Sequence, residues 1–322
     1  MAASKSWRNP DLPRTLQEFL AVHGALNGRL CIALSGGRDS VALLSVAARL
    51  GLEGRLSALH VHHGLSPFAG AWEDHCRALC HDMRVPLTVR RVEVARHSGQ
   101  GLEAAARQAR YRVFAECPAE VLLLAHHLGD QAETLLFNLL RGSGVTGAAG
   151  MPVERHLGAI RLLRPWLQVP PEAIAGYAER EALRWIEDES NADTGFSRNF
   201  LRHEILPRLQ GRFPAVLSAL GSAAEHFSEA DALLGELAAQ DWLAADAGES
   251  LSMVAARRLS FERLANLLRW RLRRLGWQLP VSARLEEFVR QLQDARPDRH
   301  PLLSLPQGEL RVRGGQLEFL LR

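Results

Sequence analysis

The chain has 322 residues, of which 47% are apolar, 23% charged and 6% aromatic, and its formal net charge is +3. This composition is ordinary for globular proteins and excludes a collagen-like, coiled-coil or disordered chain. No stretch approaches the roughly 18 unbroken apolar residues of a membrane helix, and the first residues contain no apolar segment of the secretory kind. We therefore expect a cytoplasmic protein of about two domains, with no membrane partner.

Lysine and cysteine usage excludes further classes. Lys5 is the only lysine, and it lies in a polar N-terminal segment. A Walker-type phosphate loop and a Schiff-base enzyme both need a lysine at the site, so neither is expected. The four cysteines form no C-x-x-C pair, which argues against a thioredoxin-like centre or a four-cysteine zinc site. Cys76 and Cys80 are four residues apart, and we predict that they share the buried face of a helix.

Short apolar runs alternate with amphipathic patterns over the first 190 or so residues. The runs predict strands at residues 29–34, 55–61, 86–94 and 120–125, and the patterns predict helices at 39–50, 71–83, 101–115 and 130–140. Strands that alternate with helices of this length indicate βαβ units and an α/β fold with a doubly wound parallel sheet. In such sheets the ligand lies beyond the carboxyl ends of the strands.

The pattern changes after residue 165. We expect helices at residues 172–181 and 198–209, a polar loop at 188–196, and a hairpin at 308–321 around Gly314 and Gly315. From residue 214 onward the chain is rich in alanine and leucine, so we predict a catalytic domain at 1–213 and a smaller, mainly helical domain at 214–322. Residues 257–274 contain seven arginines and one acidic residue, and they form either a nucleic-acid contact or a solvated helix face.

The strongest local signal follows the first predicted strand, where the sequence S-G-G-R-D-S precedes a helix. Adjacent glycines permit positive φ and close approach of the backbone to a ligand, and the helix start offers unpaired amides and a positive dipole end. A triphosphate can bind there without a lysine, although a simple strand–turn–helix with a polar cap has the same outline. The predicted phosphate-binding residues are Ser35, Gly36, Gly37, Arg38, Asp39 and Ser40.

This hexapeptide resembles the PP-loop of N-type ATP pyrophosphatases, which cleave ATP to AMP and pyrophosphate and pass through an adenylated substrate. Four further segments resemble one branch, the tRNA(Ile)-lysidine synthetases. They begin at His60 (H-V-H-H-G-L), Gly101 (G-L-E-A-A-A-R-Q-A-R-Y), Ala125 (A-H-H-L-G-D-Q-A-E-T) and Trp185 (W-I-E-D-E-S-N). Together with the PP-loop they match the family in order and spacing over roughly residues 28–210.

The sequence departs from the family at three points. Gly129 stands where an aspartate usually precedes Asp130, which weakens any role that needs two carboxylates there. Ser66 replaces a residue that is often basic. The chain ends at residue 322, so we expect a shorter form without the last domain of longer members.

The resemblance implies ATP and Mg²⁺ as cofactors, and L-lysine and the tRNA(Ile) with a CAU anticodon as partners. Lysine would be joined to C2 of the wobble cytidine, which changes codon recognition from AUG to AUA. Among residues matched to the motifs, we expect Asp39, His127, Asp130, Arg107 and Arg110 to be catalytic. His60 and Arg141 would join the PP-loop in nucleotide binding, and Asp39 and Asp130 would hold Mg²⁺. The expected substrate-binding residues are Glu133, Asp188, Ser190, Asn191, Arg198, Asn199 and Arg202.

Several interpretations stay open at this point. Asp130 and Glu133 could merely cap a helix, and Asp188, Ser190 and Asn191 could form an ordinary polar loop. The general base is either Asp130 or His127. The rival functions are another PP-loop tRNA-modifying enzyme such as a thiolase, or a non-catalytic nucleotide-binding module. The sequence leaves open whether the chain forms a homodimer.

Overall fold

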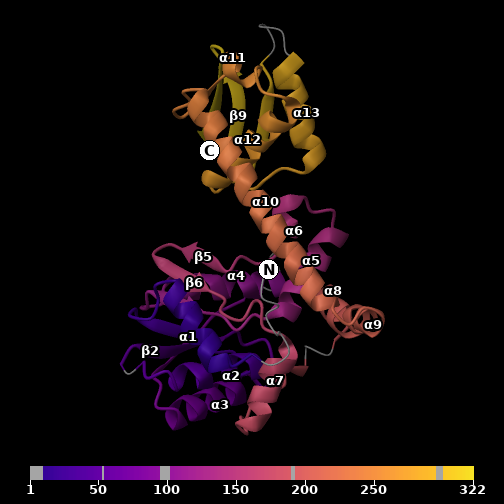
Figure 1. Cartoon of the computed structure of the whole chain (residues 1–322). Coiled ribbons are helices and arrows are strands. Elements are labelled where there is room, and N and C mark those ends of the chain that lie inside the picture. The colour runs from indigo at the N-terminus through magenta and orange to yellow at the C-terminus, as the bar shows by residue number, and fades with distance from the viewer. Residues whose placement is uncertain (1–9, 53, 95–101, 190–192, 295–299) are drawn as a thin grey trace. The chain divides into compact units, whose positions relative to one another are not determined.

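The computed structural model describes residues 10–52, 54–94, 102–189, 193–294 and 300–322. The chain forms two compact units, Met1–Ser228 and Glu229–Arg322, which Figure 1 colours from indigo to orange and from orange to yellow. The predicted boundary at residues 213 and 214 falls just before the long helix α10 (Val216–Ala244), whereas the two units divide within that helix. The extent of an independently folding catalytic domain therefore stays a prediction.

The first unit is built on a six-stranded sheet with the order β3-β2-β1-β4-β6-β5. The parallel strands are β1 (Leu30–Ala33), β2 (Leu56–His62), β3 (Leu87–Arg91), β4 (Val121–Leu123) and β6 (Ile160–Leu163). The edge strand β5 (Glu154–Leu157) pairs antiparallel with β6. The predicted α/β class and its four parallel strands are confirmed, and the β5–β6 hairpin adds a mixed edge that the sequence analysis missed.

Alternation of side chains along the strands divides the core between the two faces of the sheet. In β1, Leu30 and Ile32 face a core shared with α1 (Leu12–Val22), α2 (Arg38–Ala48), α3 (Ala69–Asp82) and α7 (Pro171–Arg180). Cys31 points into the opposite core, where Phe114 of α4 (Leu102–Ala115) packs. The sheet is therefore covered on both faces, as the near-continuous apolar strands predict. Cys76 and Cys80 are both buried in the first of these cores, which confirms their shared helix face.

Several short helices continue the first unit. They are α5 (Leu128–Leu140), α6 (Val145–Ala148), α8 (Ser197–Phe200) and α9 (Leu206–Arg212), with a π-helical turn, η2 (Leu201–Ile205), between the last two. The sequence pattern predicts one continuous helix at 198–209. This prediction is wrong in detail, because the wider π-helical turn η2 separates α8 from α9. Such turns are frequent at functional sites because they change the direction in which side chains project.

The second unit combines helices with a four-stranded antiparallel sheet. After α10 it contains β7 (Leu251–Ser252), α11 (Met253–Ala256), α12 (Phe261–Arg274), α13 (Ser282–Asp294), β8 (Leu302–Leu305), β9 (Gly308–Arg313) and β10 (Gln316–Leu321). The sheet order is β7-β10-β9-β8, so the predicted hairpin is confirmed and gains a neighbour on each side. Across the described parts of both units, no helix is long and apolar enough to span a membrane.

Candidate nucleotide and substrate site

The glycine loop between β1 and α2 has the backbone geometry that the sequence predicts. Gly36 has φ +91°, a conformation that other residues rarely adopt, whereas Gly37 is the extended N-cap of α2. Because Gly37 has no side chain, the first amides of α2 carry no side-chain cap and are directed to the space beyond the helix. These amides and the positive end of the helix dipole form an anion site.

The two serines of the loop hold it in shape. Ser40 Oγ donates to the Gly37 carbonyl at 2.9 Å and lies 3.0 Å from Ser35 Oγ. The amide of Gly37 in turn donates to Ser35 Oγ at 3.2 Å. In this geometry Ser35 and Ser40 tie the loop to the first turn of α2, so direct donation of either hydroxyl to phosphate stays a prediction.

Gly36 is enclosed by residues that the sequence analysis did not connect with the loop. Its carbonyl accepts a hydrogen bond from the Ile186 amide at 3.0 Å. A Cβ atom at Gly36 would lie 3.0 Å from Ile186 Cδ1 and 3.2 Å from Cys76 Sγ. Ile186 belongs to the W-I-E-D segment, so this segment braces the loop before it reaches Asp188.

His60 lies beneath the loop. Its side chain is buried, and its Nδ1 lies 2.9 Å from the Leu34 carbonyl, directly before Ser35. Burial lowers the pKa of His60, so the ring is neutral at pH 7 and Nδ1 donates to that carbonyl. The structure therefore supports a positioning role for His60, and its predicted contact with nucleotide stays untested.

His127 brings two carboxylates together at the carboxyl end of β4. It is the N-cap of α5, where its Nδ1 accepts from the Asp130 amide at 3.3 Å and Asp130 Oδ2 accepts from the His127 amide at 3.0 Å. In its neutral form the ring therefore carries its proton on Nε2. That atom lies 3.6 Å from Asp39 Oδ2 and 3.5 Å from Asp130 Oδ2. Capping and function are thus compatible, because the cap orients His127 toward the PP-loop.

Electrostatics favour the charged form of Asp39. Burial acts to raise its pKa, but His127 and then Arg38 outweigh burial and hold the pKa below its usual value. For His127, burial lowers the pKa, but Asp130 and Asp39 outweigh it and the pKa is raised. The arrangement is an Asp–His–Asp cluster in which both carboxylates favour the protonated form of the His127 ring.

Two arginines neutralise a buried carboxylate beside this cluster. Glu133 is almost fully buried and accepts from Arg202 Nε at 2.9 Å and from Arg198 Nη1 at 3.2 Å. Arg202 Nη2 also donates to Asp130 Oδ1 at 2.8 Å. The π-helical turn η2 carries Arg202, while α8 carries Arg198. The structure therefore brings four predicted site residues from two distant motifs into one ion-pair network.

Arg141 lies against the same aromatic ring as Arg198. Its guanidinium and that of Arg198 are each 5.1 Å from the centroid of the Phe137 ring. Both contacts are within the range of cation–π attraction. Arg141 is thus placed with a predicted substrate-binding residue, and its assignment to nucleotide binding stays a prediction.

The two arginines of α4 have different partners. Arg110 Nε donates to His63 Nε2 at 3.3 Å, which links α4 to the end of β2. Burial, aided by the charge of Arg110, lowers the pKa of His63 to about 4, so the ring accepts this bond as a neutral group. Arg107 instead contacts Tyr111, with Nη2 3.0 Å from the hydroxyl oxygen.

The remaining predicted residues lie in the loop before α8. Ser190 and Asn191 fall outside the described residues, whereas Asp188 is described and half-buried. Asn199 Nδ2 donates to the Asp193 carbonyl at 2.9 Å, which fixes the turn that leads into α8.

A metal ion would find two carboxylates here. Within the described residues, no group of three or more His, Cys, Asp or Glu side chains is placed to ligate a metal. Mg²⁺ requires fewer protein ligands than three, because it is commonly held by one or two carboxylates together with waters and substrate phosphates. Asp39 and Asp130, which face the same His127 nitrogen, fit that requirement.

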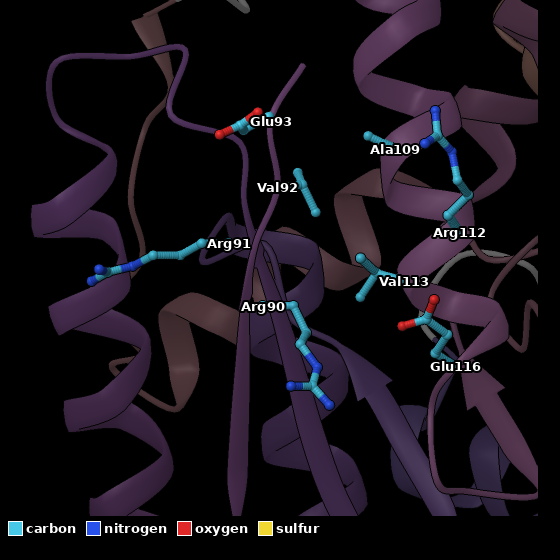
Figure 2. A pocket seen from close by; sticks show the side chains of 8 residues that line it. All are labelled: Arg90, Arg91, Val92, Glu93, Ala109, Arg112, Val113 and Glu116. Atoms are coloured by element: carbon cyan, nitrogen blue, oxygen red, sulfur yellow. The ribbon is translucent and has the colours of Figure 1, made fainter. Parts of the chain in front are cut away.

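A pocket of about 470 Å³ lies apart from these residues, between β3 and α4 (Figure 2). Its charged side chains include both signs, and it contains none of the predicted site residues. It is lined by Arg90, Arg91, Val92, Glu93, Ala109, Arg112, Val113 and Glu116. The predicted site residues therefore point to the glycine-loop edge of the sheet rather than to this pocket.

In the second unit, two arginines of the arginine-rich segment contact side chains of their own unit. Arg271 lies 4.6 Å from the Trp242 ring centroid and 5.8 Å from that of Phe319. Arg273 pairs with Asp231 at 3.3 Å. Both arginines therefore have structural contacts, which reduces the case for either as a nucleic-acid contact.

Fold and site together define a PP-loop enzyme. A family model described as a PP-loop domain matches residues 9–209, and a model described as a TilS substrate binding domain matches residues 251–318. The expectation of an ATP-using PP-loop domain is confirmed.

Relatives specify the family further. The tRNA(Ile)-lysidine synthase of Alkalilimnicola ehrlichii is 48% identical over 307 residues, which are 94% of this chain and 69% of the relative. That of Nitrosomonas europaea is 41% identical over 325 residues, or 99% and 71% of the two chains. The chain belongs to the tRNA(Ile)-lysidine synthase family, and it is a ligase that forms a carbon–nitrogen bond.

A solved structure of low sequence identity also supports the fold. The U34-tRNA thiolase of Methanococcus maripaludis is 16% identical and covers 67% of this chain and 78% of its own, with a TM-score of 0.55. At this identity the likeness concerns the fold alone.

Proposed function

We propose that the chain joins L-lysine to C2 of the wobble cytidine in the tRNA(Ile) whose anticodon is CAU, with ATP converted to AMP and pyrophosphate. The observation that carries this proposal is the convergence of Asp39, His127, Asp130 and Glu133 beside the glycine loop, in a chain of this family. The modified base pairs with A instead of G, so the tRNA reads AUA rather than AUG.

The first step makes an unreactive carbonyl into a leaving group. The C2 oxygen of cytosine attacks the α-phosphorus of ATP, and pyrophosphate departs. Charge that develops on the phosphates is stabilised by the preorganised amides at the start of α2 and by the guanidinium of Arg38. Because these amides are fixed before the substrate arrives, little reorganisation is needed during the reaction.

The second step needs a neutral amine. The ε-amino group of lysine has a solution pKa of about 10.4, so it must lose a proton before it attacks C2 and AMP departs. His127, already hydrogen-bonded within an Asp–His–Asp cluster, is the candidate base, and Asp130 is the alternative. Glu133 or Asp188 would hold the α-amino group of lysine, while Arg198 and Arg202 are suited to its carboxylate.

Asp39 and Asp130 would hold Mg²⁺. When bound, the ion neutralises phosphate charge and orients the triphosphate. The cytidine has to leave the anticodon stack to reach this site. We place the reaction in the cytoplasm, and a homodimer remains one arrangement to test by solution mass measurement.

The test is incubation of the chain with ATP, Mg²⁺, labelled lysine and candidate tRNAs. We expect label in the anticodon loop of the CAU isoleucine tRNA and pyrophosphate release that depends on that tRNA. Asp39→Asn should abolish the release, because the substitution removes one of the two carboxylates that would hold Mg²⁺ at the triphosphate. Sulfur transfer without lysine incorporation would favour a thiolase, and ATP binding without turnover would favour a non-catalytic module.

A further inference from the structure

Three arginines surround Tyr111 on the side of the sheet covered by α4. Arg107 lies 4.9 Å from the centroid of the Tyr111 ring, and Arg155, from β5, lies 5.5 Å from it. Arg164, which directly follows β6, interacts with the same tyrosine side chain. Arg155 and Arg164 belong to the β5–β6 hairpin, whereas Arg107 belongs to α4, which is distant in sequence, so the cluster exists only in the folded chain.

Arg164 is unusual because it is buried and incompletely partnered. Its side chain is only 2% exposed, Nη1 donates to the Pro152 carbonyl at 2.6 Å, and Nε has no hydrogen-bond partner. Burial lowers its pKa, and the charges of Arg107 and Arg155 lower it further. In the described residues, the partners of these arginines are an aromatic ring, a hydroxyl group and a main-chain carbonyl rather than carboxylates. Burial of several cations without a neutralising anion destabilises the fold, unless a bound ligand supplies the anion.

His126 joins this cluster to the reaction centre. It precedes His127 in the chain, and its Nδ1 is buried without a partner. Burial lowers its pKa to about 4, and Arg164, Arg107 and His127 add to that effect, while Asp130 opposes it. The ring is therefore neutral at pH 7 and can hydrogen-bond to an anion. Asp130 already accepts hydrogen bonds from Arg202 and from the amide of His127.

We propose that Arg107, Arg155, Arg164 and His126 bind a phosphate group next to the catalytic cluster, and we infer that it is a backbone phosphate beside the wobble cytidine. The second part rests on the proposed function. Guanidinium groups suit phosphate because they donate paired hydrogen bonds in a plane. A nucleotide that leaves its stack needs its flanking phosphates held, and positive charge does this without regard to sequence. Free pyrophosphate has the same chemistry and is the alternative source.

The test compares the full chain with Arg155→Ala and Arg155→Glu, which alter an exposed residue and leave the buried core intact. Arg84→Ala is the matched control, because Arg84 is an exposed arginine before β3, at the opposite edge of the sheet. Binding of a short RNA hairpin with a CAU loop is measured by fluorescence anisotropy over a range of KCl concentrations. Binding of inorganic pyrophosphate is measured by calorimetry.

We expect Arg155→Ala to weaken hairpin binding by about tenfold, as for loss of a charged hydrogen bond. The slope of log affinity against log salt should fall by about 0.7, the value for one phosphate contact in a single strand. Arg155→Glu should weaken binding further, and Arg84→Ala should match the parent chain. Weaker pyrophosphate binding with unchanged hairpin binding would assign the site to the free anion.

Unchanged binding of both probes in Arg155→Ala and Arg155→Glu would overturn the phosphate site. Equal losses in Arg84→Ala would also overturn it, because general charge would then explain the effect. Lysine incorporation by the parent chain is measured alongside. If the parent chain lacks that activity but the Arg155 variants still lose affinity for pyrophosphate, the proposed function fails while the phosphate site stands.

Discussion

Replacement of Gly36 by alanine tests whether the loop geometry, rather than its composition, creates the nucleotide site. At φ +91° an alanine is strained by about 1–3 kcal/mol. Its Cβ would also lie 3.0 Å from Ile186 Cδ1 and 3.2 Å from Cys76 Sγ. Overpacking of this kind costs about 1–3 kcal/mol, and the flexible end of Ile186 favours the lower part of that range. We therefore expect a total loss of about 2–5 kcal/mol.

Gly51→Ala is the matched control. Gly51 also has positive φ, +65°, but a Cβ there meets no atom within 4 Å. Its substitution should cost only the backbone strain, so the difference between the two variants isolates the crowding at Gly36, about 1–2 kcal/mol. Urea unfolding of both variants measures the two stabilities.

Activity gives the second measurement. Displacement of Ile186 pulls on its amide, which donates to the Gly36 carbonyl, so the amides at the start of α2 should move from their positions. We expect Gly36→Ala to lose tRNA-dependent pyrophosphate release by at least about a hundredfold, as for loss of a preorganised anion site. Gly51→Ala should keep it. Equal stabilities in the two variants, together with full release by Gly36→Ala, would refute the reasoning.

Two further predictions concern ion pairs. Arg202→Ala should raise the KM for lysine more than the KM for ATP, and it should reduce stability by about 1–3 kcal/mol, because buried Glu133 then keeps only Arg198 as a partner. Arg202→Lys should recover part of both losses. An unchanged KM for lysine would argue against a lysine site at Glu133 and Arg202. Arg161, and to a smaller degree His23, outweigh burial and hold the pKa of Glu154 at about 2, below its ordinary 4.5. The ionised Glu154 therefore stabilises the fold above pH 4.5, and this contribution is lost as pH falls toward 2. In urea unfolding, the stability of Glu154→Gln should depend less on pH in that interval than the stability of the parent chain. Parallel plots of stability against pH for the two chains would contradict the prediction.

Local patterns carried the prediction of the parallel sheet, its alternating helices and the glycine loop. Strand length, helical periodicity and the need for positive φ are properties of neighbouring residues, so they can be recognised without a fold. The short hairpin β5–β6 was missed because two of its β5 residues are exposed and its apolar pattern is weak. The π-helical turn was missed although the sequence holds a local signal for it, because Pro207 lies within residues 198–209 at the start of α9. A proline cannot donate to the carbonyl four residues before it, so the regular α-helix is interrupted just before that point.

The sequence by itself determined that a PP-loop follows the first strand, and it predicted that the motif residues His127, Asp130, Glu133 and Arg202 belong to one site. Only the tertiary structure decided which side chains touch: Arg202 joins Asp130 to Glu133, Ile186 braces Gly36, and Arg155 lies against Tyr111 of α4. The physical reason is that side-chain pairing across distant segments depends on the crossing of helices and strands. The angles at which helices and strands cross are set by packing of the whole core. They cannot be read from the residue spacing within any single motif.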